Sequence, residues 1–209
     1  MSDRRRIPLA SRKSPQQARS NDLVAAILEA AIQVLEKEGA QRFTTTRVAE
    51  KAGVSVGSLY QYFPNKAAIL FRLQSDEWRR TTDMLRKILA DRKRSPPERL
   101  RRLVHAFVKS ECDEAAMRVA LDDAAPLYRD APEAQAVKAE GSAIVLAYLE
   151  EALPHASAGQ RALTGDLLKT TLSCVAKQFS EKPRTAREIK AWSDAMADML
   201  CAWLGNKEG

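Results

Sequence analysis

The chain has 209 residues, of which 45% are apolar and 29% are charged. A chain of this length and composition can bury a sizeable core. No apolar run approaches the roughly 20 residues of a membrane span, and residues 1–19 lack the apolar segment of a secretory signal, so we predict a cytoplasmic protein. Cys112, Cys174 and Cys201 are odd in number and widely spaced, which disfavours a disulfide framework or a zinc cluster. We therefore predict no metal and no cofactor.

The net charge of +7 is unevenly distributed along the sequence. Residues 1–94 contain 19 Lys and Arg against 10 Asp and Glu, whereas residues 95–209 contain 15 against 17. This asymmetry predicts that the N-terminal part faces a polyanion. Residues 1–19 read as a basic flexible arm that opens with Arg4, Arg5 and Arg6 and has almost no apolar partners for a membrane surface. The arm either extends the contact with the polyanion or only improves solubility.

Four helices are predicted in the N-terminal part. Apolar residues recur at helical spacing from a cap at Ser20 or Asn21 until Gly39. Thr44 is a candidate cap for a short second helix, and Ser55 for a third that runs to about Tyr62. Asn65 is the candidate cap of a long fourth helix that reaches about Leu89.

The C-terminal part is predicted to be helical as well. Ser95-Pro96-Pro97-Glu98 combines a capping box with proline at the first helical positions. Prolines then divide the sequence into helical segments at about 113–123, 133–153, 159–179 and 185–204. No window reads as an alternating strand, so the predicted fold class is all-α.

The last predicted helix carries a large apolar seam. Ile189, Trp192, Met196, Met199 and Trp203 follow a 3-4-3-4 spacing after a Thr185 to Glu188 capping box. The seam packs either against its own subunit or against a second copy of the chain.

Residues 49–54 meet the local requirements of a helix-turn-helix. Such a motif needs a small residue where its helices cross, a residue tolerant of positive φ in the turn, and an apolar residue after it. Ala49, Gly53 and Val54 supply these in order. The whole run from Phe43 to Lys66 resembles the DNA-binding signature of the TetR family of bacterial regulators, and the match extends over about Leu23 to Leu73.

The resemblance implies roles for individual residues. The third helix would enter the major groove, and the threonines before the second helix, the tyrosines and Lys66 would contact phosphate. Tyr60 and Tyr62 could instead belong to the core. Some family members carry an arginine at the position of Thr46 that reads a guanine, and this chain lacks it. The predicted DNA-binding residues are Thr44, Thr45, Thr46, Arg47, Ser55, Val56, Gly57, Ser58, Tyr60, Gln61, Tyr62 and Lys66.

The resemblance also implies a three-helix DNA-binding head, joined by a long helix to a helical bundle that binds a ligand and forms a homodimer. The implied divisions are an arm at 1–19, the head at 20–66 and the ligand-binding and dimerisation domain at 67–209. Side chains of this kind belong more often to plain core than to a pocket wall, and the candidate pocket residues are Trp78, Leu85, Phe107, Met117, Leu121, Tyr128, Tyr148, Cys174 and Phe179. Candidate dimer-interface residues are Leu168, Leu172, Val175, Trp192, Met196, Met199 and Trp203.

The predicted function is a sequence-specific regulator, a repressor released from a palindromic DNA operator by an unidentified small-molecule effector. The first alternative is a DNA-binding regulator or activator that needs no ligand. The second is an enzyme, which is disfavoured because the sequence has no nucleophile elbow and no phosphate-binding glycine loop. Its two histidines, His105 and His155, lie fifty residues apart without clustered partners.

Overall fold

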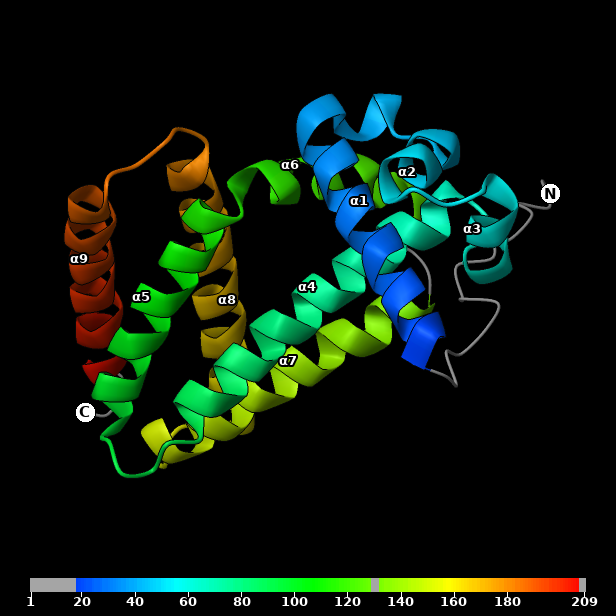
Figure 1. Ribbon diagram of the computed structural model, residues 1–209. Coiled ribbons are helices and arrows are strands. Elements are labelled where there is room, and N and C mark those ends of the chain that lie inside the picture. Colours follow the sequence, from blue (N-terminus) through cyan, green and yellow to red (C-terminus); the bar gives the residue numbers. More distant parts are fainter. Residues whose placement is uncertain (1–17, 129–131, 207–209) are drawn as a thin grey trace, which may run out of the picture. The chain divides into compact units, whose positions relative to one another are not determined.

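The computed structural model describes residues 18–128 and 132–206, and all regular structure in these ranges is helical (Figure 1). No helix in the described part of the chain is both long and apolar enough to cross a membrane. The arginines at positions 4–6 lie outside the described residues. The α-helices are α1 (Ala18–Arg42), α2 (Thr45–Ala52), α3 (Val56–Tyr62), α4 (Lys66–Leu89), α5 (Pro96–Asp113), α6 (Ala115–Ala124), α7 (Pro132–Ala152), α8 (Ala158–Ser180) and α9 (Ala186–Gly205), with a 3₁₀ turn η1 (Ala125–Leu127).

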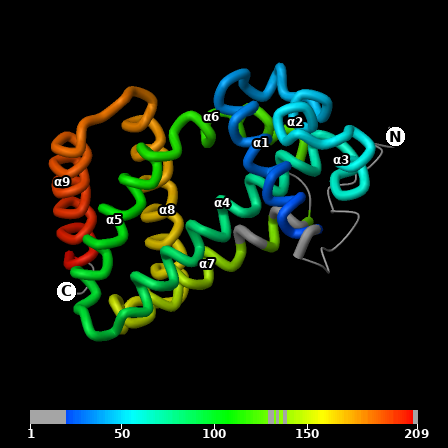
Figure 2. Tube along the Cα trace, viewed as in Figure 1, coloured from blue at the N-terminus to red at the C-terminus, as the bar shows by residue number. Residues whose placement is uncertain are grey.

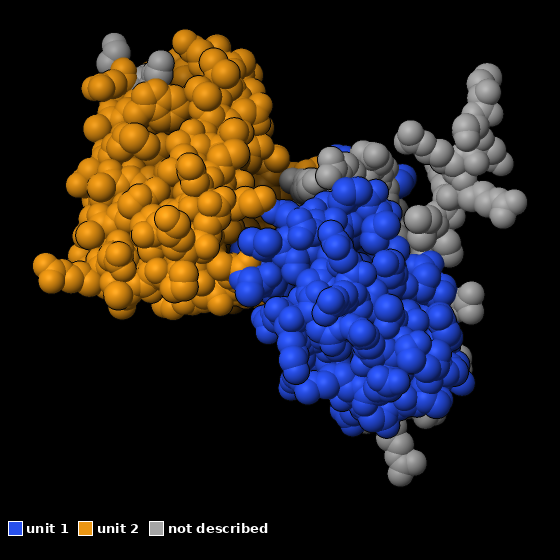
Figure 3. Space-filling model, turned by 90° about the horizontal axis from the view of Figure 1, so that it is seen from above, with its two compact units in different colours: residues 1–77, 116–135 blue, residues 78–115, 136–209 orange. Residues whose placement is uncertain are grey.

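The chain divides into two compact units (Figure 3). Unit 1 comprises residues 1–77 and 116–135, and unit 2 comprises residues 78–115 and 136–209. Two helices, α4 and α7, each begin in unit 1 and end in unit 2.

In unit 1, the first three helices lie beside one another (Figure 1) and contribute side chains to a buried core. Ile27, Leu35, Phe43, Val48 and Leu59 are fully buried, and they come from α1, α2, α3 and the segment before α2. Gly39 was predicted to stop the first helix. It does leave helical geometry, with φ 73° and ψ 171°, but the helix resumes and ends at Arg42. A positive φ favours glycine, since it carries no Cβ to strain the backbone.

Unit 1 also contains α6, which the sequence placed in the C-terminal domain. Tyr128 is buried at the end of this segment, and its ring lies 5.6 Å from that of Phe71 in α4. Its hydroxyl donates to the Leu121 carbonyl at 3.0 Å, and burial raises its pKa. The buried Glu77 pairs with Arg118 at 2.8 Å. Residues 116–135 therefore belong to the N-terminal unit by packing, because α6 buries its apolar and ionic partners there.

In unit 2, α5 packs against both α8 and α9 (Figure 2). Leu100, Leu103, Val104 and Val108 line the buried side of α5 and form one core cluster with residues of α7, α8 and α9. A Cβ on Gly165 would lie 3.3 Å from a Leu149 methyl group, so α7 and α8 approach closely at this glycine.

Candidate DNA-binding site

The turn between α2 and α3 has the geometry that the sequence predicted. Gly53 follows α2 in the left-handed region, at φ 68° and ψ 29°. The Val54 amide donates to the Ala49 carbonyl at 3.0 Å. Ala49 is fully buried, as its place at the crossing of the two helices requires. A turn of this kind fixes the direction of the second helix relative to the first.

The N-terminal end of α3 presents hydroxyl groups to solvent. The Ser55 side chain caps the helix by accepting from the Ser58 amide at 3.0 Å, and its Oγ lies 2.8 Å from the Ser58 Oγ. Gly57 and Gln61 are exposed, and Val56 is half-buried. Leu59 holds the opposite side of α3 in the core. The predicted base-reading residues Val56, Gly57, Ser58 and Gln61 therefore share the more accessible side of a helix whose buried residues are Leu59 and Tyr62.

The two tyrosines of α3 lie in different environments. Tyr60 is 40% exposed, and its hydroxyl is hydrogen-bonded to the Thr45 hydroxyl at 3.1 Å. Tyr62 is only 7% exposed, and its hydroxyl is bonded to the Ser20 hydroxyl at 2.8 Å. Tyr62 therefore packs in the core of unit 1, as the alternative for this residue anticipated, whereas Tyr60 stays at the surface.

The start of α2 is organised by local and non-local contacts. Thr44 caps the helix, with its Oγ1 accepting from the Arg47 amide at 3.3 Å. Thr44 and Thr46 are exposed, and Thr45 is half-buried. The Arg47 guanidinium forms an ion pair with Glu38 of α1. Sequence reasoning missed Glu38, and it missed Ser20 beside Tyr62, because both partners lie outside the motif.

The first turn of α4 is fixed by Asn65. Its Oδ1 accepts from the Ala68 amide at 2.9 Å, as predicted for a helix cap. Lys66 is exposed at the first helical position. The free amides of a helix N-terminus and a neighbouring ammonium group both favour a phosphate.

The candidate pocket residues do not gather in one compact unit. Met117, Leu121 and Tyr128 are buried in unit 1, and the other six belong to unit 2. Among those six, Tyr148 is buried and donates its hydroxyl to the Pro96 carbonyl at 2.9 Å, whereas Cys174 is exposed. Leu85, Phe107 and Phe179 pack against the core cluster of unit 2, and Trp78 is half-buried.

The candidate dimer-interface residues fall into three groups by burial. Leu168, Leu172 and Met196 are buried in the core of their own unit, where they belong to one cluster with residues of α5 and α7. Val175, Trp192 and Trp203 are partly buried against the same core. Met199 is 53% exposed. The seam on α9 thus packs largely against its own subunit. The large apolar residues exposed on α8 are Leu163 and Leu167, which the sequence pattern did not single out.

A helix-turn-helix with exposed hydroxyls at both helix N-termini, followed by a helical C-terminal part, defines a class of DNA-binding transcription regulators. Comparison with protein families agrees with this class. Residues 27–73 match the model of bacterial regulatory proteins of the tetR family, and residues 95–206 match the tetracyclin repressor-like C-terminal domain. The second match covers more than half of the chain. The chain belongs to the TetR family of transcription regulators.

Individual relatives are similar over part of the sequence or in fold. The nucleoid occlusion factor SlmA of Vibrio campbellii is 39% identical over 83 residues, which are 39% of this chain and 42% of that protein. The chain therefore matches less than half the length of this curated relative.

Two solved structures share the fold. The regulator PfmR of Thermus thermophilus superposes with a TM-score of 0.67 at 20% identity, over 84% of this chain and 97% of that chain. FadR of Bacillus subtilis, solved in complex with stearoyl-CoA, superposes with a TM-score of 0.65 at 15% identity, over 85% of this chain and 97% of that chain.

Proposed function

We propose that the chain is a homodimeric transcription repressor that binds a palindromic DNA operator through α3 and is released by a small-molecule effector. One observation carries the DNA-binding part of this proposal. The N-termini of α2 and α3 both present exposed hydroxyls, and the hydrogen bond between Thr45 and Tyr60 joins them. Amides and hydroxyls at helix N-termini position a protein on phosphates, while side chains of the second helix read bases.

The roles follow from side-chain chemistry and exposure. Gln61 can pair with an adenine edge, and the Ser58 hydroxyl can donate or accept. Gly57 allows the backbone to approach the groove, since no side chain intervenes. Thr44, Thr46 and Lys66 contact phosphate, and Arg47 joins them when it leaves Glu38.

A homodimer is part of the proposal, since two copies of α3 read a palindrome as two half-sites. Leu163 and Leu167 of α8, 62% and 46% exposed, offer an apolar surface for the second copy together with Met199 of α9. Analytical ultracentrifugation of Leu163→Glu/Leu167→Glu is expected to give monomers. Val119→Glu, a charge placed on an exposed valine of unit 1, should remain dimeric. If the doubly substituted protein is still a dimer, the interface does not include Leu163 and Leu167.

Effector control is supported by the fold shared with FadR of Bacillus subtilis, which was solved with stearoyl-CoA. A ligand lowers DNA affinity only if it binds the DNA-free arrangement of the dimer more tightly than the DNA-bound one. Repression follows if the operator overlaps a promoter. In vitro transcription from such a template should fall when the protein is added, and a rise would identify an activator instead.

The test of DNA recognition is selection of bound duplexes from a random pool, followed by affinity measurements at several salt concentrations. Recovery of a palindrome is expected. Gln61→Ala should relax the base preference at one symmetric pair of operator positions, with a loss of about 1–3 kcal/mol of discrimination between bases per half-site. Lys66→Ala should weaken binding to all sequences and lower the salt slope by about 1 per subunit. Lys93→Ala, which removes an exposed lysine of unit 2, is the matched control. Binding without sequence preference would refute the proposal.

A further inference from the structure

A groove of about 800 Å³ lies between α5 and α9 in unit 2, and we call it the α5–α9 groove. Its apolar lining includes Ile88, Ala106 and Ile189. Five of its lining residues are Arg or Lys, one is His105, and one, Asp113, is acidic. This basic lining stands out because residues 95–209 carry more acidic than basic groups. The volume lies within the range of about 300–1,000 Å³ that is usual for small-molecule sites.

Arg184 is held in place at this groove by an aromatic stack. Its Nε donates to the Phe179 carbonyl at 2.8 Å, and its guanidinium carbon lies 4.4 Å from the centroid of the Phe179 ring. Phe179 in turn stacks on Trp192, with centroids 4.5 Å apart and planes 18° apart. Within the described ranges, the one hydrogen bond found for the Arg184 side chain is that of Nε, and no carboxylate lies within 4.0 Å of it, although its charge helps to lower the pKa of Glu188. Such a fixed, planar pair of donors matches a carboxylate or a phosphate.

The other cations of the groove are engaged only in exposed ion pairs. Exposed pairs contribute little and are screened by salt, so an incoming anion can compete with them. The pairs are Lys109–Asp113, Lys190–Asp194, Arg101–Asp198 and Arg102–Asp91. Besides pairing with Lys190, Asp194 lies 2.9 Å from the His105 Nε2.

We propose that the α5–α9 groove binds an amphipathic anion, with its carboxylate or phosphate head on Arg184 and its apolar part against Ile88, Ala106 and Ile189. Both the apolar residues and Arg184 are needed to select this chemistry. An inorganic anion would leave the apolar surface exposed to water, and a neutral apolar ligand would make no hydrogen bond to the Arg184 guanidinium. The binding site stands on its own geometry. The further statement that this anion is the effector rests on the proposed function.

Isothermal titration calorimetry of the full chain with octyl phosphate, below its micellar concentration and without DNA, tests the site. We expect one octyl phosphate per chain. Inorganic phosphate and octyltrimethylammonium should each bind at least tenfold more weakly. Equal binding of either probe would overturn the proposal, since it would show that the head or the chain is not recognised.

Two variants locate the site. Arg184→Gln should weaken octyl phosphate binding at least tenfold, whereas Arg187→Gln, the same change three residues later at an exposed position that does not line the groove, should alter it less than twofold. Ala106→Phe should fill the groove and abolish binding while leaving Arg184 intact. It keeps the test valid if Arg184→Gln fails to fold, as judged by circular dichroism. Unchanged affinity in a folded Arg184→Gln or Ala106→Phe protein would overturn the site.

The effector role is tested separately by the release of operator DNA. Octyl phosphate should weaken operator binding by wild type and Arg187→Gln, and should not weaken binding by Arg184→Gln. Binding to the groove without release would overturn the effector role and leave the site in place. Failure to bind any operator, with octyl phosphate binding intact, would instead refute the proposed function.

Discussion

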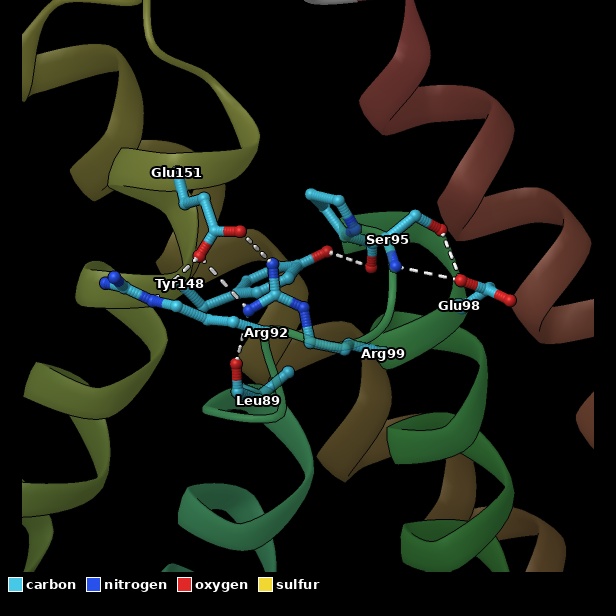
Figure 4. Close-up of polar contacts among 8 residues, drawn as sticks. Leu89, Arg92, Ser95, Glu98, Arg99, Tyr148 and Glu151 are labelled. Carbon is cyan, nitrogen blue, oxygen red and sulfur yellow. Dashed lines mark hydrogen bonds and ion pairs between the residues drawn. The ribbon is translucent and has the colours of Figure 1, made fainter.

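Arg99 joins three helices of unit 2 and offers a sharp test of how buried charge is stabilised in this fold (Figure 4). Its side chain is only 1% exposed. Nη1 donates to the Leu89 carbonyl at the end of α4 at 2.6 Å and to a Glu151 carboxylate oxygen at 3.2 Å, and Nη2 donates to the other oxygen. The guanidinium also lies 5.4 Å from the centroid of the Tyr148 ring. The hydrogen bonds from Arg99 hold the pKa of Glu151 below its ordinary value.

We predict that Glu151→Ala lowers the free energy of unfolding by about 2 kcal/mol. Breaking a fully buried pair costs about 3–5 kcal/mol and breaking an exposed one about 0–1 kcal/mol. Glu151 is 39% exposed while Arg99 is buried, which places this pair between the two limits. Arg99→Met keeps most of the side-chain volume and removes the charge. It leaves the Leu89 carbonyl unsatisfied, at about 1–3 kcal/mol.

The decisive quantity is the coupling between the two substitutions. Once Arg99 is methionine, no buried charge remains to be compensated, so Glu151→Ala should then cost less than about 0.5 kcal/mol. The four proteins of this cycle should be unfolded in urea at one protein concentration, because a dimer's stability depends on concentration. Equal costs of Glu151→Ala in both backgrounds would refute the reasoning.

Three further predictions concern the same measurement. Gly53→Ala should lower the free energy of unfolding by about 1–2 kcal/mol through its positive φ alone, since an added Cβ meets nothing within 4 Å. Gly57→Ala, at a position with helical geometry, should leave the free energy of unfolding unchanged or raise it. Glu77→Ala should lower the free energy of unfolding by about 3 kcal/mol, because the largely buried Arg118 loses its ion-pair partner. Adding Arg118→Met should restore most of this stability, since it removes the unpaired charge. Because the pKa of Glu151 is lowered in the folded state, its stabilisation is complete above the ordinary carboxyl pKa and is lost as the pH falls through the folded value. Stability between pH 7 and pH 3 should therefore decline less steeply in Glu151→Gln, and an unchanged slope would contradict this.

Five helix starts were predictable because a cap is a local interaction. The start of the first helix was not, since α1 begins at Ala18 and the predicted caps Ser20 and Asn21 lie inside it. Thr44, Ser55 and Asn65 each accept from an amide three residues later, as the sequence predicted. The capping boxes at Ser95 and Thr185 are confirmed as well, since the Glu98 and Glu188 carboxylates accept from the Ser95 and Thr185 amides. Each depends on residues that are neighbours in the chain, so the pattern alone is sufficient.

The remaining contacts could not be predicted, because their partners are distant in sequence. An arginine such as Arg99 reads as a solvated residue of an amphipathic helix until α7 brings Glu151 to it, 52 residues away. Tyr62 is separated from Ser20 by 42 residues. The apolar spacing of α9 was equally ambiguous, since 3-4 periodicity shows that a face is apolar without showing what covers it.

The proposed groove and the proposed DNA-reading residues are linked by α4, which carries Lys66 at its first position and Ile88 one residue before its last. Two mechanisms of release can therefore be separated. If octyl phosphate competes with DNA phosphates for the cations of the head, operator affinity should fall without limit as its concentration rises, and Arg184→Gln should make no difference. If it acts from the groove through α4, the loss of affinity should level off at the ratio of its affinities for the two states of the dimer. By the same linkage, saturating operator DNA should weaken octyl phosphate binding by that factor. A plateau that disappears in Arg184→Gln identifies the groove as the origin of the coupling, because the head is unchanged in that variant.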